Sequence, residues 1–165
     1  YTDSNAQLPP DPIKMVLITN ASMFHRKHVE RGLKILDKNQ GEIWAKLEAG
    51  TDDYYQLIER TAIPFQQVLD NLLTTARIRP LVIQSLFMQV NGTPPSEHEI
   101  QAYCQRLNDI TDNGGSLASV QIYTIARQPA ESYVTPLADE TVDAIVKQVT
   151  AQTGLRVEGF YGYPT

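Results

Sequence analysis

The 165-residue sequence contains a single cysteine, Cys104, no long apolar run and no cluster of Lys and Arg residues. One cysteine excludes any disulfide within the chain, and this favours a reducing compartment, so we expect a cytoplasmic protein. No apolar stretch approaches the roughly 18 residues of a membrane span, and the N-terminus lacks the apolar segment of a signal peptide. The sequence therefore gives no indication of membrane insertion.

Positive charge is also scarce. The formal net charge is −5, with hydrophobic residues at 42% and charged residues at 20%. These proportions are typical of a globular domain. An acidic chain without a basic patch does not indicate binding to nucleic acid or to a membrane surface.

Familiar catalytic and metal-binding motifs are absent. The sequence has no Gly-x-Gly-x-x-Gly, Walker, Gly-x-Ser-x-Gly or His-Glu-x-x-His motif. His25 and His28 have no further ligand at a suitable spacing, so we predict no metal site. Cys104 lies among apolar residues of a predicted helix, which favours a place in the core over a role as a nucleophile.

Short apolar runs alternate with amphipathic helical patterns along the chain. We predict strands at 13–20, 42–47, 81–87, 120–125 and 156–160, and helices at 27–39, 51–58, 64–76, 96–112 and 139–153. Residues 1–12 are polar and carry three prolines, so we expect an irregular lead-in there. Strict alternation of strands and helices predicts parallel strands joined by right-handed crossovers.

The spacing of the strands suggests a barrel. A complete (β/α) barrel has eight strand–helix units in about 250 residues, and this chain has roughly half of them. We predict an α/β fold: a partial (β/α) TIM-like barrel with about four to five parallel strands in sequential order and helices outside. The alternation also permits an open doubly wound sheet. The chain begins with Tyr1, and we expect a segment of a longer protein.

Ligands of parallel α/β folds bind at the carboxyl ends of the strands. The polar residues predicted near those ends are Thr19, Asn20, Lys46, Glu48, Gln84, Ser85 and Arg127. Polar groups within buried strands are costly unless they are paired, which makes them candidates for a ligand site. The structural alternatives are turn formation by Asn20, an internal Lys46–Glu48 ion pair, and a bond from Gln84 to the backbone of a neighbouring strand.

Three segments at or after predicted strand ends have sequences, and an order along the chain, that resemble those of a known family. Segment 17–21 reads LITNA, segment 46–49 reads KLEA and precedes an acidic helix, and segment 90–92 reads VNG and precedes a capping box at Ser96–Glu99. These segments resemble the radical SAM superfamily from its third barrel strand onward. Residues 120–131 resemble a branch of radical SAM oxidoreductases that includes the tRNA wyosine-forming enzymes. The resemblance spans roughly residues 14–150.

The resemblance implies that 13–165 is the C-terminal segment of a radical SAM barrel. In that family three cysteines of a Cys-x-x-x-Cys-x-x-Cys loop hold a 4Fe-4S cluster, and reductive cleavage of S-adenosylmethionine gives a 5′-deoxyadenosyl radical. That loop and a Gly-Gly-Glu-like motif are absent here and would lie upstream of Tyr1. We therefore expect cluster and S-adenosylmethionine in the parent protein, none bound to this segment alone, and no activity from it alone.

The resemblance also suggests roles. It implies Glu48 near the ribose hydroxyls, Lys46 or Gln84 near the methionine carboxylate, and the stretch from Tyr123 to Arg127 near the adenine or the substrate. It assigns no catalytic residue. The expected partner is the missing N-terminal half of the barrel, or a second copy bound through the exposed sheet edges. Two alternatives are an α/β domain that binds a phosphorylated small molecule, and a partner-binding module.

Overall fold

The computed structural model describes residues 14–162, in which strands and helices largely alternate. The strands are β1 (Val16–Thr19), β2 (Glu42–Lys46), β3 (Leu81–Leu86), β4 (Gln89–Val90), β5 (Leu117–Tyr123), β6 (Val134–Thr135) and β7 (Val157–Phe160). The helices are α1 (Lys27–Lys38), α2 (Asp52–Glu59), α3 (Phe65–Ala76), α4 (Glu97–Asp112) and α5 (Asp139–Thr153). The predicted lead-in at residues 1–12 lies outside the described residues.

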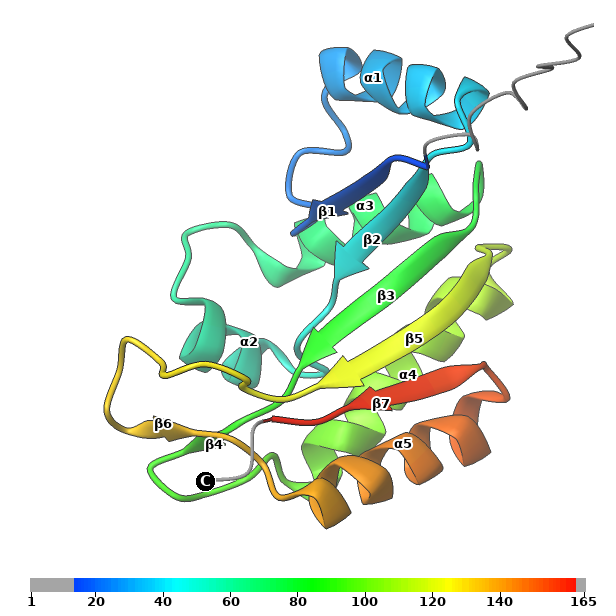
Figure 1. The fold of residues 1–165 in the computed structure, drawn as a ribbon. Helices are drawn as coiled ribbons and strands as arrows, with labels where there is room; N and C mark the ends of the chain where they lie inside the picture. Colours follow the sequence, from blue (N-terminus) through cyan, green and yellow to red (C-terminus); the bar gives the residue numbers. More distant parts are fainter. Residues whose placement is uncertain (1–13, 163–165) are drawn as a thin grey trace, which may run out of the picture.

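Five of the strands form one sheet in the order β1-β2-β3-β5-β7, and every neighbouring pair is parallel (Figure 1). This order is also the order along the chain, so the sheet has no point at which the strand order reverses. An open doubly wound sheet requires such a reversal. The prediction of sequential parallel strands in a partial TIM-like barrel is therefore confirmed.

The two faces of this sheet differ. One face packs against helices α3, α4 and α5 (Figure 1), and its core side chains are Ile43, Ala45, Leu81, Ile83, Val120 and Ile122. Alternation along each strand sends the neighbouring side chains to the opposite face. The register there aligns Ile18 with Trp44 and Val82, and Lys46 with Gln84 and Gln121. We call this second surface the open face; in a closed barrel it would be the interior.

Two of the helices begin with a side-chain cap, and the one at Ser96 was predicted. Thr51 accepts a hydrogen bond from the Tyr54 N–H of α2, and Ser96 accepts one from the Glu99 N–H of α4. We predicted that α3 begins at Pro64. In the structure Pro64 is the N-cap, and the helix begins one residue later, at Phe65. Cys104 is buried in the core, as predicted.

Candidate ligand site at the strand ends

Three side chains meet where β2 and β5 end. The Lys46 Nζ lies 3.2 Å from the Glu48 Oε1, and the Tyr123 hydroxyl donates a hydrogen bond of 3.4 Å to the same oxygen. The Lys46 Nζ also lies 6.0 Å from the centre of the Tyr123 ring. Lys46 and Glu48 are two residues apart on either side of the strand end, which puts both side chains over the same face. The ion pair expected as a structural alternative is present.

Burial and charge act against each other on these groups. Burial acts to lower the pKa of Lys46, but Glu48 and then Tyr123 outweigh it, so the pKa is raised on balance. Burial, followed by the negative charge of Glu48, raises the pKa of Tyr123. At neutral pH the lysine is therefore charged and the phenol neutral, which leaves the Tyr123 hydroxyl as a hydrogen-bond donor.

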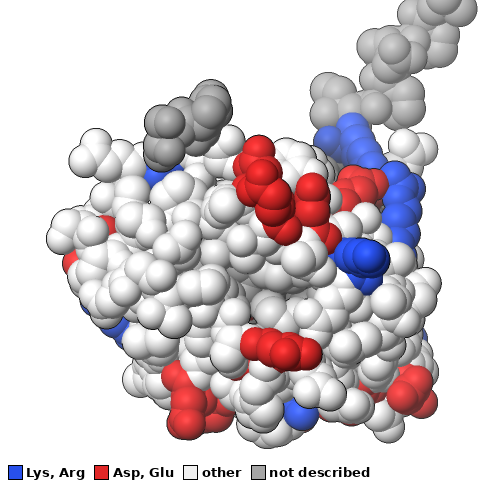
Figure 2. Space-filling model, turned by 90° about the horizontal axis from the view of Figure 1, so that it is seen from below, with Lys and Arg blue, Asp and Glu red and all other residues white. Residues whose placement is uncertain are grey.

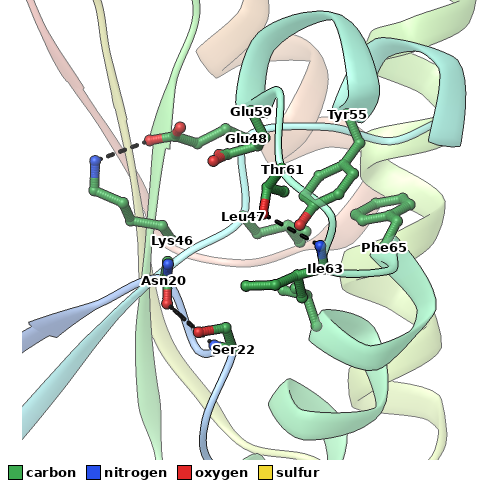
Figure 3. A pocket seen from close by; sticks show the side chains of 11 residues that line it. Asn20, Ser22, Lys46, Leu47, Glu48, Tyr55, Glu59, Thr61, Ile63 and Phe65 are labelled. Atoms are coloured by element: carbon green, nitrogen blue, oxygen red, sulfur yellow. Dashed lines mark hydrogen bonds and ion pairs between the residues drawn. The ribbon is translucent and has the colours of Figure 1, made fainter.

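A second carboxyl group, Glu59, joins the cluster from the last turn of α2 (Figure 3). The pKa of Glu59 is raised to about 7. Burial is the largest cause, followed by a hydrogen bond with Glu48 and the negative charge of Glu48. Two neighbouring carboxyl groups in a partly buried place share a proton more readily than both ionise. Glu59 was not among the predicted site residues, because its proximity to Glu48 depends on the tertiary fold.

Lys46, Glu48 and Glu59 line a cleft between the strand ends and the β2–α3 connection. Its lining comprises Asn20, Ser22, Lys46, Leu47, Glu48, Tyr55, Glu59, Thr61, Ile63, Phe65 and Val68 (Figure 3). The enclosed space is about 40 Å³, room for a few water molecules. Pockets for drug-sized ligands have about 300–1,000 Å³. A nucleotide-sized ligand would therefore have to extend from this cleft over the open face.

The remaining predicted site residues fall into different places. Thr19 and Asn20 accept hydrogen bonds from the backbone N–H groups of Ala21 and Ser22, so both stabilise the turn after β1. Asn20 also lines the cleft. Gln84 donates a 2.8 Å hydrogen bond to Gln121 on the next strand of the open face. The structural alternative for Gln84 was a bond to the backbone of a neighbouring strand, whereas the partner found on that strand is a side chain.

Ser85 and Arg127 also lie outside the cluster. Ser85 is buried on the helix-covered face, where its hydroxyl bonds the Leu47 carbonyl and the Tyr103 hydroxyl. Arg127 lies exposed in the loop between β5 and β6. That loop reaches α2 through a different pair, because Glu131 lies 2.9 Å from the Arg60 guanidinium.

Acidic groups dominate this end of the molecule. Helices α2, α4 and α5, which follow strand ends, each carry two acidic residues in the first turn. The face seen from below shows acidic side chains in several separate patches and no broad basic patch (Figure 2). Among the described residues, no helix has the length and apolar character to cross a membrane.

Comparison with known proteins gives a similarity of fold. No protein-family model matches the sequence, and no curated protein matches it. The structure is similar to the crystal structure of a radical SAM methyltransferase from Sphaerobacter thermophilus, with a TM-score of 0.57 and 15% sequence identity. The similarity covers 80% of this chain and 38% of that protein. The fold of this chain is therefore similar to that of part of the neighbouring protein.

Proposed function

We propose that this chain is a segment of a radical SAM enzyme and supplies part of the pocket for S-adenosylmethionine and substrate. The observation that carries this proposal is the meeting of Lys46, Glu48, Glu59 and Tyr123 at the strand ends of a sequential parallel sheet. Strand ends are where barrels and related folds bind their ligands. The resemblance in sequence and the similarity of fold point to the same family.

The residues of the cluster suit the groups of S-adenosylmethionine. Glu48 can accept hydrogen bonds from ribose hydroxyls, and Lys46 can attract a carboxylate. Tyr123 offers a hydroxyl donor and an aromatic face beside them. The bound cofactor supplies the hydrogen-abstracting radical of the family, and this segment would orient it and exclude water.

The described residues do not fit an iron–sulfur cluster. Residues 14–162 contain no group of three His, Cys, Asp or Glu side chains arranged to hold a metal. Cys104 is buried in the core, and burial raises the pKa of its thiol. A 4Fe-4S cluster requires thiolate ligands. In our proposal those ligands come from a part of the enzyme outside this segment.

The acidic helix starts disfavour the alternative of a phosphorylated ligand. Phosphate binds at a helix N-terminus because free N–H groups and the helix dipole attract it. Acidic residues already occupy the first turns of α2, α4 and α5, and their charge would repel a phosphate.

Glu48→Gln in the enzyme that contains this segment tests the proposal. Loss of a charge-assisted hydrogen bond costs about 1.5–3 kcal/mol, so we expect S-adenosylmethionine to bind roughly ten- to 150-fold more weakly by calorimetry. Glu140→Gln is the matched control, because Glu140 is exposed at the start of α5. Unchanged affinity together with a lower melting temperature would assign Glu48 a purely structural role.

A further inference from the structure

The loop that carries Glu48 is held on its C-terminal side by a buried carboxylate from α4. Glu99 is 3% exposed, and its Oε1 accepts a hydrogen bond from the Gly50 N–H. Its Oε2 accepts a 2.6 Å hydrogen bond from the Thr51 hydroxyl. A capping box predicts instead that this glutamate turns back to the N–H of Ser96. Here the side chain reaches a loop 48 and 49 residues earlier in the chain.

The N-terminal side of the same loop is held from the same helix. Tyr103 lies one turn after Glu99, on the same side of α4. Its hydroxyl is 2.6 Å from the Ser85 hydroxyl, which donates a 2.6 Å hydrogen bond to the Leu47 carbonyl. Ser85 and Tyr103 have no exposed surface. The backbone is therefore fixed both immediately before Glu48 and two residues after it.

The contact between this loop and α4 is a close one. A Cβ atom added to Gly50 would lie 2.1 Å from the Tyr103 backbone nitrogen, so only glycine allows this approach. Thr51 accepts the Tyr54 N–H at 3.2 Å and so caps α2 while it bonds Glu99. Glu59 is the last residue of that short helix. One set of bonds thus sets the position of both carboxyl groups of the cleft.

We propose that Glu99 and Tyr103 form a brace, called here the α4 brace, that positions Glu48 and Glu59 beside each other without contacting the ligand. A buried carboxylate is costly unless its hydrogen bonds are satisfied, and those of Glu99 are used on this loop. This proposal extends the proposed function. It depends on that function only for the identity of the ligand that the two carboxyl groups bind.

The pKa of Glu59 can be measured without any ligand, and it depends on the positions that the brace sets. The groups that act on its pKa are Glu48, which raises it, and Lys46, which lowers it, beside the effect of burial. Carboxyl carbon shifts measured by NMR over a pH titration give that pKa directly. Glu99→Gln and the milder Ser85→Ala remove opposite sides of the brace. Ile110→Val, in the buried face of α4 but outside the brace, is the matched control.

We expect the Glu59 titration to move from about 7 toward the ordinary value of about 4.3 in both brace variants. The Ile110→Val control should titrate as wild type. If the Glu59 titration stays as in wild type in both brace variants while their melting temperatures fall, the brace residues have only a structural role and the proposal is overturned. A wild-type Glu59 that titrates normally would overturn it too. Failure of the S-adenosylmethionine experiment alone would leave the brace standing and change only the ligand.

Discussion

The proton of Glu59 couples the candidate site to the stability of the fold. Burial and Glu48 raise its pKa to about 7, whereas a glutamate in an unfolded chain titrates near 4.3. Between these two values the folded state binds more protons than the unfolded state. The free energy of unfolding therefore falls as the pH rises through this window. The contribution of Glu59 is complete below the lower value and lost above the upper one.

Glu59→Gln should reduce this pH dependence. The amide keeps the shape and the hydrogen-bonding capacity of the protonated carboxyl but cannot ionise. We expect the variant to lose less stability than wild type between about pH 4.5 and about pH 7.5, as measured by urea unfolding. Glu140→Gln, at an exposed position of α5, should keep the wild-type slope. An unchanged slope in Glu59→Gln would show that the fold does not raise the pKa of Glu59.

The sequence predicted those site residues whose face of the sheet is determined by the alternation of side chains along a strand. Lys46 and Glu48 are two residues apart, so both had to point to one face at the end of β2. The same rule separates Gln84 from Ser85, which are adjacent and lie on opposite faces. Glu59 enters the cleft because α2 turns back toward the strand end. Neither that turn nor the resulting proximity to Glu48 is contained in any local pattern.

At the scale of elements, strands and helices with a strong periodic pattern were predicted well. The exceptions have identifiable causes. Strand β5 begins at Leu117, three residues before the predicted start at residue 120. The additional residues pair with β3 across a shift in register between Leu81 and Val82. Strands β4 and β6 have two residues each, too few to show alternation, and they pair across more than forty residues of sequence. Their pairing depends on the tertiary fold.

The contact of the β2–α2 loop with α4 gives a prediction at this scale. Gly50→Ala would place a methyl group against the backbone of Tyr103, which cannot move without shifting the helix. Such overpacking costs about 1–3 kcal/mol, to be measured by chemical unfolding. Gly32→Ala is the control, because a Cβ there meets nothing within 4 Å.

The control variant should behave in the opposite way. Gly32 lies in the interior of α1, where replacing glycine by alanine stabilises a helix by about 0.5–1 kcal/mol. Equal effects of Gly50→Ala and Gly32→Ala would show that the loop does not rest on α4 as closely as the structure has it.

At the scale of the whole molecule, the sheet is incompletely covered. Parallel sheets normally have both faces covered, whereas the open face exposes Ile18 at 56% and Phe160 at 46%. In residues 14–162 no strand pairs with the outer edge of β1 or of β7. An apolar groove next to β1 is lined by Met15, Val16, Leu17, Val29, Gly32, Leu33 and Leu36. These surfaces are what a second half of a barrel would cover.

We propose that a second copy covers this surface when the chain is studied by itself. Unpaired strand edges and exposed apolar patches both promote association. We expect concentration-dependent dimers in analytical ultracentrifugation, weakened by Ile18→Lys, because Ile18 lies in the open face on the edge strand. Ile78→Lys makes the same chemical change at a 69% exposed residue before β3 and should leave the dimer intact. A monomer at every concentration, or equal weakening by both variants, would contradict association through the open face.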